Sequence, residues 1–450
     1  MTGINRRGAI AGTIAGISVL SLGTVGHAFQ PVDRFVRRQG IGFVRDGAPY
    51  RIVGANMWYA AWLGADTDYG DRGRLLRELD RLQSIGVNNL RIMAAAEEGP
   101  LRNSIRPGFT REDGGENRAL FEGLDFALAE IGKRGMTAVV ALSNFWEWSG
   151  GLQTILGRVT GGPYVDNGDP AAPWPAFADA TAAFYANAEA RALYDRHLDA
   201  IVGRTNTITG KSYRDDPAIM SWQLANEPRP GGSDAMIAAT SDAYFDWIDA
   251  SFARIRSLDP NHLLSLGQEG TMATNGSEAI VRRAHAGADY LTAHIWPLNW
   301  SWVAGDDLAG TWANGKAKTE DYIAVHQRLA AQAGKPLVIE EFGFPRDGEE
   351  YAPDVPTAFR QQFYSVIYKA VEQSWAASGP LAGSNFWAWN GEARAKHDDF
   401  RFVNGDGAYM GDPPHEPQGW YGNFDTDTAM LDLIKSHAAT AATHASKDKS

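Results

Sequence analysis

The feature that most constrains the fold is a regular alternation of short apolar runs with amphipathic stretches. Between the runs, apolar residues recur at helical spacing over residues 75–82, 120–131, 193–202 and 245–255. A strand followed by a helix, repeated along the chain, favours parallel pairing through right-handed crossovers. We therefore predict an α/β fold, a closed (β/α)8 TIM barrel rather than an open doubly wound sheet. The eight predicted strands are residues 51–55, 89–93, 138–142, 219–224, 263–266, 290–294, 337–341 and 384–387.

The domain organisation is predicted to be simple. No change in composition, linker or repeat marks a second domain, so residues 29–450 are expected to form one catalytic domain. Three stretches, residues 150–180, 305–318 and 396–419, are expected to be long loop insertions, the last because it is rich in Gly, Asp and Pro.

The first 28 residues have the pattern of an export signal. Arg6 and Arg7 precede a weakly apolar, Gly-rich run, and residues 26–28 form a plausible cleavage site of small residues. This resembles a twin-arginine signal peptide, which predicts export to the periplasm or the medium. The alternative is an uncleaved membrane anchor, since the run is just long enough to cross a bilayer. No other segment is apolar enough to do so.

Composition excludes several functions. Lys and Arg total 42 against 54 Asp and Glu, a net charge of −12, so a nucleic-acid partner is not expected. Cysteine is absent, which excludes disulfides, thiolate metal sites and a Cys nucleophile. The histidines show no metal-ligand spacing, and the acidic residues 398–406 lack the EF-hand pattern, which favours a solvated loop over a calcium site. We expect no metal and no cofactor.

Two glutamates stand at the ends of predicted strands. Glu227 follows the fourth strand and Glu341 ends the seventh, and a barrel of this kind carries its chemistry at the carboxyl ends of its strands. A pair of carboxylates is what hydrolysis of a glycosidic bond requires, one as proton donor and one as nucleophile or base. The alternative, two exposed acids in surface ion pairs, is less favoured because both stand on strand ends.

Other acids are weighed against these two. Glu340 precedes Glu341 on a strand, so alternation predicts that it points to the opposite face, toward the helices. Five more glutamates follow strand ends and are candidates to line the cleft. Glu269 is the one expected to contact substrate, and the others are Glu97, Glu98, Glu147 and Glu392.

Aromatic residues indicate the substrate class. Of 15 Trp, eight fall at or just after predicted strand ends. Aromatic faces stack on the apolar faces of sugar rings, so a row of them predicts an open cleft for a linear β-linked glycan. Packing of the long loops is the alternative, and it is preferred for Trp148 and Trp302. The eight are Trp58, Trp146, Trp148, Trp296, Trp300, Trp302, Trp387 and Trp389.

Two short motifs resemble those of a known enzyme family. Asn226-Glu227-Pro228 after the fourth strand and Glu341-Phe342-Gly343 after the seventh resemble the signatures of glycoside hydrolase family 5, a retaining (β/α)8 barrel family. The similarity runs from about residue 43 to residue 433. Within the family, residues 142–146, 294–300 and 411–419 are most similar to bacterial endo-β-1,4-mannanases.

The resemblance implies roles for individual residues. Glu227 would be the acid/base and Glu341 the nucleophile, and Arg91 would hold Glu341 ionised. Glu227 would then need a proton near neutral pH, which a partly apolar setting from Trp222, Trp296 and Trp387 would favour. The remaining site residues implied by the resemblance are Asn144, Trp146, Asn226, His294 and Trp387.

One position departs from the family pattern. The family usually has Tyr two residues after the strand-six His, and this chain has Trp296. An indole donates a hydrogen bond but cannot share a proton as a phenol can. Trp296 is therefore expected either to support Glu341 through its N–H, the interpretation slightly preferred, or to stack on a sugar ring.

The function predicted from sequence is a retaining endo-β-1,4-mannanase that acts on β-mannan or a related β-1,4-linked polysaccharide. An endo-β-1,4-glucanase and an exo-acting β-mannosidase of the same family remain alternatives, and a non-catalytic glycan-binding barrel is disfavoured by the two carboxylates. We expect a monomer with no stable membrane partner.

Overall fold

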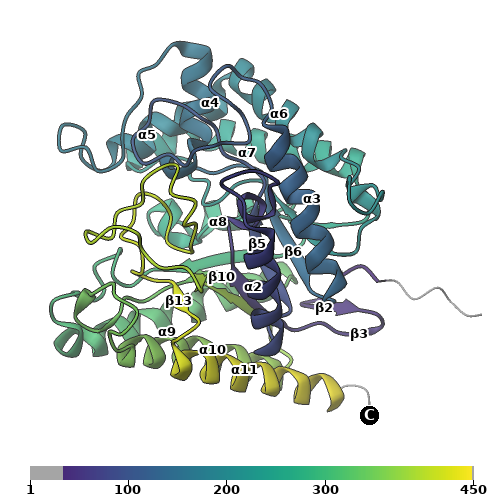
Figure 1. The fold of residues 1–450 in the computed structure, drawn as a ribbon, viewed down its shortest axis with the longest axis vertical. Coiled ribbons are helices and arrows are strands. Elements are labelled where there is room, and N and C mark those ends of the chain that lie inside the picture. The colour runs from purple at the N-terminus through teal and green to yellow at the C-terminus, as the bar shows by residue number, and fades with distance from the viewer. Residues whose placement is uncertain (1–33, 448–450) are drawn as a thin grey trace, which may run out of the picture. The chain divides into compact units, whose positions relative to one another are not determined.

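Eight parallel strands form the centre of the molecule (Figure 1). The computed structural model describes residues 34–447, so the predicted signal peptide lies outside the described residues. Each predicted strand is present, with bounds that differ by at most a few residues. They are β4 (Ile52–Asn56), β5 (Asn89–Met93), β6 (Thr137–Ala141), β7 (Ile219–Gln223), β8 (Leu263–Ser265), β9 (Leu291–Ile295), β10 (Leu337–Phe342) and β11 (Leu381–Phe386).

The strands are arranged as a barrel. Their order is β8-β7-β6-β5-β4-β11-β10-β9, and every neighbouring pair is parallel. The two ends of this order are joined by backbone hydrogen bonds from Asp289 N to Leu264 O (2.8 Å) and from His294 N to Glu269 O (3.0 Å). The prediction of a (β/α)8 barrel is confirmed.

At least one helix follows each barrel strand, and these helices cover the outside. The helices at 75–82, 120–131, 193–202 and 245–255 are confirmed, and each buries its apolar side. Several begin after a capping residue: Asp71 accepts from Arg74 N (2.8 Å) and Ser233 from Met236 N (3.1 Å). The helices are α2 (Arg72–Ser84), α3 (Arg118–Lys133), α6 (Ala188–Val202), α7 (Asp234–Leu258), α8 (Glu278–Ala284), α9 (Leu308–Ala333), α10 (Ala358–Ala376) and α11 (Thr428–Lys447).

Two of the expected loop insertions contain helix. Residues 150–180 include α4 (Gly151–Thr160) and the start of α5 (Ala176–Ala182), and α9 already begins at Leu308. Glycines bound α4: Gly150 precedes it, and Gly161 ends it with a left-handed φ of 75°. A further short helix, α1 (Ala60–Gly64), follows β4. Residues 396–419 contain no helix or strand, as predicted.

A small antiparallel sheet covers the amino-terminal end of the barrel. Its strands are β1 (Arg37–Gln39), β2 (Gly42–Arg45) and β3 (Ala48–Pro49). Phe43 from this sheet packs edge-on against Tyr290 at 5.4 Å, within a separate apolar cluster that includes Val338. The sequence did not predict this sheet, because its strands are only two to four residues long.

A bulge in β10 changes the direction of two side chains. Ile339 pairs with Ala293 and Glu341 with His294, so Glu340 is an extra residue relative to β9. Both Glu340 and Glu341 consequently face the barrel interior. The prediction that Glu340 points toward the helices is wrong, because it assumed uninterrupted alternation along the strand.

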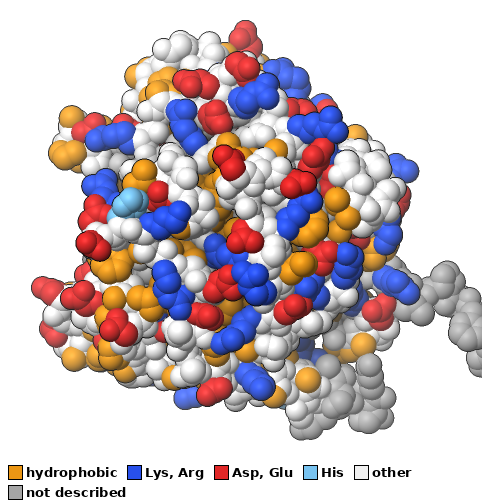
Figure 2. Space-filling view, in the orientation of Figure 1, with side chains coloured by type: hydrophobic (Ala, Val, Ile, Leu, Met, Phe, Trp, Pro, Cys, Tyr) orange, Lys and Arg blue, Asp and Glu red, His pale blue; other side chains and the backbone are white. Residues whose placement is uncertain are grey.

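Among the described residues, no helix combines the length and apolarity that crossing a membrane requires. On the face shown in Figure 2, acidic and basic side chains are interspersed, and hydrophobic side chains gather in a hollow between the loops.

Candidate active site

A cavity of about 460 Å³ opens at the carboxyl ends of the barrel strands. Its walls come from the segments that follow β6, β7, β8 and β9, from the ends of β10 and β11, and from residues 392–422. We call this last segment the β12–β13 loop, since it joins β12 (Trp389–Gly391) to β13 (Asn423–Phe424). The lining residues used below are Trp146, Trp148, Trp174, Asn226, Glu227, Arg229, Glu269, Trp296, Glu341, Trp387, His415 and Glu416.

Glu227 stands directly after β7 in an unusual backbone conformation. Its φ is 50°, in the left-handed region that residues other than glycine rarely adopt. This conformation is held by the hydrogen bond from Glu227 N to Gly267 O (2.9 Å). The carboxylate accepts from the indole of Trp146 (2.5 Å) and from Nδ1 of His294 (2.7 Å).

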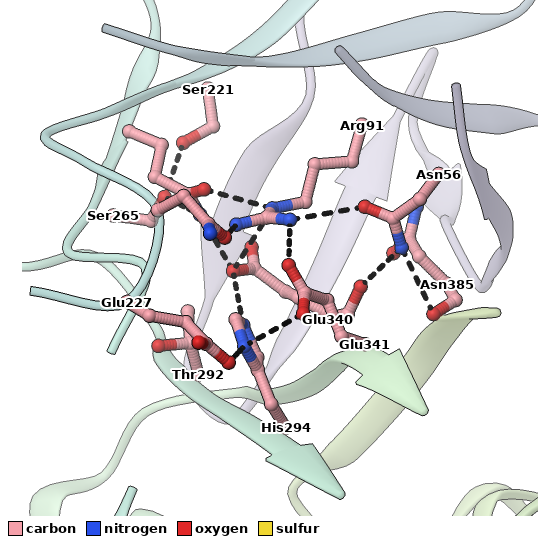
Figure 3. Close-up of polar contacts among 12 residues, drawn as sticks. Asn56, Arg91, Ser221, Glu227, Ser265, Thr292, His294, Glu340, Glu341 and Asn385 are labelled. Atoms are coloured by element: carbon pink, nitrogen blue, oxygen red, sulfur yellow. Dashed lines mark hydrogen bonds and ion pairs between the residues drawn. The ribbon is translucent and has the colours of Figure 1, made fainter. Parts of the chain in front are cut away.

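Glu341 faces Glu227 across the cavity floor. Its carboxylate is paired with the guanidinium of Arg91, and Nδ1 of His294 lies 3.2 Å from its second oxygen. One oxygen of each glutamate and a ring nitrogen of His294 all lie within 4.8 Å of one another. This spacing fits the separation of about 5–5.5 Å between the carboxyl groups of retaining glycosidases. Figure 3 shows these side chains around His294.

Arg91 organises the base of the site. Besides Glu341, it donates to Asn56 (3.0 Å), Gln223 (2.8 Å) and the amide oxygen of Asn226 (2.6 Å). The amide nitrogen of Asn226 donates to Asn144 (3.0 Å), and Asn226 lines the cavity. Asn144 is fully buried and does not line the cavity, so its contact is with Asn226.

The charges of the site differ from the sequence-based expectation. Burial raises the pKa of Glu227, but the hydrogen bond and charge of His294 and the charge of Arg229 lower it by more, so its pKa lies well below the usual value. Burial lowers the pKa of His294, but Glu341, Glu227 and Glu340 raise it well above the usual value. In the free protein the proton therefore resides on His294, because His294 lies between carboxylates, a juxtaposition that sequence spacing does not reveal.

The expected apolar setting of Glu227 is only partly present. Trp296 and Trp387 line the cavity, whereas Trp222 is fully buried elsewhere and donates to Asp259 (2.7 Å). The indole nitrogen of Trp387 is buried without a hydrogen-bond partner in the described chain.

Glu269 lines the cavity beside Glu227 and is ion-paired with Arg229. Burial raises the pKa of Glu269 to about 7, although the charge of Arg229 opposes this. The guanidinium of Arg229 lies over the rings of Trp146 (5.2 Å) and Trp174 (5.3 Å). Trp174, 54% exposed, extends this aromatic surface outward, and the sequence analysis did not single it out.

The predicted tryptophans divide into two groups. Trp146, Trp148, Trp296, Trp300 and Trp387 line the cavity. The other three are buried and are not among its lining residues. Trp58 donates to Gly411 O (2.9 Å), Trp389 donates to Glu78 (2.7 Å), and Trp302 packs against Trp300.

Trp296 makes ring contacts and, among the described residues, no hydrogen bond. Its ring packs edge-on against Tyr421 (5.0 Å) and Trp387 (5.8 Å). Gly343 must lack a side chain for this, since a Cβ there would meet the Trp296 ring at 2.5 Å. The preferred interpretation, an indole donor to Glu341, is not what the structure shows, because Arg91 and His294 already occupy that position.

Glu416, a buried acid of the cavity wall, was not assigned to the site from sequence, whereas Glu147, a candidate from sequence, is buried and is not among the lining residues. Glu416 lines the cavity, and burial together with Asp412, Glu341 and Glu227 raises its pKa well above the usual value. Burial raises the pKa of Glu147 to about 7. Each has one carboxyl oxygen without a partner in the described chain. Glu416 lies within the family-like residues 411–419, in a loop without periodicity, so its place in the cavity wall follows from the fold and not from a sequence pattern.

One group could reach a common metal ion. Within residues 34–447, Glu227, His294 and Glu341 are the only such cluster, and its members already bind one another and Arg91. In the acidic loop at 398–406, Asp406 accepts from His397 (2.9 Å) and Asp399 from Arg401 N (3.1 Å). That no metal or cofactor is required stays a prediction.

A (β/α)8 barrel with two buried glutamates facing each other in a tryptophan-lined cavity defines a glycoside hydrolase. The sequence matches the family model described as GH family 5 beta-mannosidase-like over residues 33–447. The chain belongs to glycoside hydrolase family 5 and is an enzyme of that family.

Known relatives agree with this assignment. The chain is similar to mannan endo-1,4-beta-mannosidase 1 of Arabidopsis thaliana, with 29% identity over 374 residues, covering 78% of this chain and 81% of the relative. The crystal structure of a family 5 mannosidase from Rhizomucor miehei is similar with 33% identity and a TM-score of 0.83, covering 92% of this chain and 99% of that one. A variant of that mannosidase in complex with mannosyl-fructose is similar with a TM-score of 0.80.

Proposed function

We propose that this enzyme hydrolyses β-mannosidic bonds with retention of configuration. The observation that carries the proposal is the pair Glu227 and Glu341, whose oxygens lie close enough for a double displacement, in a cavity lined by aromatic rings. The mannan and mannosidase relatives, and the family model that the chain matches, support mannose as the sugar.

In the first step Glu341 attacks the anomeric carbon. The ion pair with Arg91 holds its carboxylate in place at the cavity wall. Glu227 gives a proton to the departing glycosidic oxygen, which breaks the bond and leaves the sugar attached to Glu341 as an ester. The proton reaches Glu227 from Nδ1 of His294, with which it shares a 2.7 Å hydrogen bond.

In the second step water replaces Glu341 at the anomeric carbon. Esterification has removed the charge of Glu341, so Glu227 can accept a proton from the water. Asn226, held by Arg91 and Asn144, offers its free amide hydrogen to the sugar hydroxyl next to the reacting carbon. Such a contact strengthens as positive charge develops on the sugar.

The β12–β13 loop favours attack at a chain end over the internal cleavage that the sequence predicts. The loop, yellow in Figure 1, crosses the ends of β4 and β5: Gly411 O accepts from Trp58, and Asn404 donates to Ser104 O (2.9 Å). His415 then stacks on Trp148 from the β6 side, at 6.4 Å and 20°. A polysaccharide that passes through the site would have to displace these contacts.

Glu416 gives the closed end of the cavity a chemical role. Its raised pKa favours the neutral carboxyl group, which can both donate to and accept from sugar hydroxyls. An unpartnered buried oxygen is costly unless a ligand satisfies it. We therefore favour removal of terminal mannose from β-1,4-linked chains, with internal cleavage of mannan as the second candidate.

Analysis of early products tests both parts of the proposal. The enzyme is incubated with linear mannan, mannotetraose, galactomannan and carboxymethylcellulose, and products are followed by chromatography and by proton NMR of the new anomeric centre. We expect mannose as the main early product, first appearing as the β-anomer, and no products from carboxymethylcellulose. Mixed oligosaccharides from mannan would favour internal cleavage, and an initial α-anomer would refute the double displacement.

A further inference from the structure

Glu340 is a third buried carboxylate next to the catalytic pair. Its side chain is completely excluded from solvent inside the barrel. The carboxylate accepts from Nε2 of Gln223 (2.6 Å) and from the hydroxyl of Tyr290 (3.1 Å), and Nε of Arg91 lies 3.9 Å away. Burying a charge is costly, and a neutral residue of similar size would avoid that cost. The mechanism described above gives Glu340 no role.

The β10 bulge brings Glu341 into line with Glu340 and His294. Val338 packs in the apolar cluster inside the barrel and Ile339 in the outer one, so alternation turns Glu340 inward, and the bulge turns Glu341 inward as well. With it, two consecutive carboxylates meet the imidazole from the same strand: Glu341 lies 3.2 Å from Nδ1 and Glu340 lies 4.0 Å from Nε2. Figure 3 shows this arrangement.

The two nitrogens of His294 face different partners. Nδ1 is hydrogen-bonded to Glu227, the residue that must deliver a proton to the leaving group. Nε2 is buried and has no hydrogen-bond partner among the described residues, and the carboxylate of Glu340 is the anion in front of it. A negative charge there stabilises a proton on Nε2 in both the charged and the neutral imidazole.

We propose that Glu340 is a positioning residue that acts through His294 to keep Glu227 supplied with the proton taken by the leaving group. Glu340 holds a proton on Nε2, so the proton that leaves the imidazolium is the one on Nδ1. The N–H bond at Nδ1 breaks, an O–H bond forms on Glu227, and both residues become neutral. In the second step Glu227 takes a proton from water and returns it to Nδ1. This inference rests on the proposed function.

Several charged groups from neighbouring strands determine the strength of the effect. Glu340 faces Arg91 on β5, Tyr290 before β9 and His294 on β9, and the more distant His285 also interacts with its charge. His294 in turn faces Glu227, Glu340, Glu341 and, farther away, Glu269. Since Arg91 is shared by Glu340 and Glu341, removal of Glu340 leaves its pairing with Glu341 in place.

The test compares substrates that differ in their need for a proton donor. Glu340→Gln removes the charge, while a glutamine can still accept from Gln223 and donate to Tyr290. We expect kcat/KM for mannotriose to fall at least about 10-fold. The leaving group of dinitrophenyl β-mannoside needs no proton, so kcat/KM for that substrate should change by less than about 2-fold. Glu227→Ala serves as the reference and should show the same contrast more strongly.

The pH profile supplies a readout that a structural role would not change. The negative charge of Glu340 raises the pKa of the proton shared by His294 and Glu227, so its removal should lower that pKa. The basic limb of kcat/KM for mannotriose should move to lower pH by about one unit or more in Glu340→Gln. Glu372→Gln is the matched control, since Glu372 also pairs with a histidine (His437 Nδ1, 2.7 Å) but lies far from the cavity side of the barrel, between α10 and α11.

A second measurement needs no variant at position 340. In protein with ¹⁵N-labelled histidine, one imidazole, identified by its loss in His294→Gln, should keep its Nε2 proton from pH 5 to pH 9, a range of about four units. An Nδ1-only neutral form of His294 would overturn the proposal. The proposal would also be overturned if Glu340→Gln lowered kcat/KM equally for both mannosides and left the basic limb of the pH profile unchanged. If the wild type cleaves only glycosides of another sugar, the proposed function fails, and the same comparison on that sugar still tests Glu340.

Discussion

At the scale of single residues, the nucleophile is held by very few donors. Arg91 and His294 contact Glu341, and no aromatic hydroxyl or indole in the described chain does. Trp296 instead presents its ring to the cavity and packs on Trp387 and Tyr421. The residue in the position of the family tyrosine therefore shapes the sugar site rather than the charge of Glu341.

Substitutions of Trp296 test whether its ring shapes the sugar site or its indole N–H acts on Glu341. Trp296→Phe should keep kcat within about 3-fold, because no hydrogen bond is lost, whereas Trp296→Ala should raise KM at a cost of about 1 to 2 kcal/mol. Steady-state kinetics on mannotriose measures both. Trp302→Phe, outside the cavity wall, is the control. A fall in kcat of more than about 10-fold in Trp296→Phe would show that the indole N–H acts on Glu341 during the reaction.

The three glutamates of the site show which features the sequence can predict and which it cannot. Glu227 and Glu341 were identified because each lies at the end of an apolar run, where a parallel barrel places its functional groups. Glu340 was predicted to face the helices because strict alternation was assumed. The bulge depends on how β10 pairs with β9, and the sequence of β10 alone does not indicate it. The low pKa of Glu227 depends on the position of His294, which lies on another strand.

At the scale of elements, the β12–β13 loop is ordered around one buried carboxylate. Asp412 accepts from the backbone N–H groups of Gly419 (2.8 Å), Tyr421 (2.7 Å) and Gly422 (3.0 Å). The side chain of Asn390 adds a fourth hydrogen bond, at 3.1 Å. This network fixes the segment that carries His415 and Glu416 to the cavity.

Removal of this carboxylate should open the cavity. Asp412→Ala leaves three buried N–H groups without an acceptor, each at a cost of about 1–3 kcal/mol, so the loop should lose its fixed position. We expect KM for mannotriose to rise about 10-fold or more, faster proteolysis within residues 396–419, and a larger share of oligosaccharides among the products from mannan. Asp399→Ala, in the exposed part of the same loop, is the control. Unchanged kinetics and proteolysis in Asp412→Ala would mean that other contacts order the loop.

The helices and strands that could be predicted are those that follow the repeating strand-helix pattern of the barrel. Barrel strands and outer helices recur with fixed periods, so their order and approximate bounds follow from the sequence. Helix α4 was missed because glycines at both of its ends, Gly150 and Gly161, resemble loop composition. The path of the β12–β13 loop depends on single buried contacts, such as the hydrogen bond from Tyr421 N to Asp412. The spacing of apolar residues in the sequence does not indicate such contacts.

At the scale of the whole molecule, we propose that the enzyme is exported, so that it meets polysaccharide outside the cytoplasm. The signal predicted for residues 1–28 has the Arg6-Arg7 pair that a twin-arginine receptor recognises. Replacement of the pair by Lys-Lys preserves its charge but should leave most of the precursor in the cytoplasm. Cell fractionation with immunoblotting measures this, and a change of two exposed lysines elsewhere to arginine is the control. Unchanged export of the Lys-Lys form would contradict this route.

The left-handed backbone at Glu227 has a consequence for how such an enzyme can be improved. A glutamate with a φ of 50° is conformationally unfavourable, and glycine or asparagine would occupy the position at lower cost. Stability and catalysis therefore make opposite demands on this one residue. Libraries screened only for heat resistance would tend to enrich inactive variants at position 227, so a thermostability screen of this enzyme has to select for sugar release in the same step.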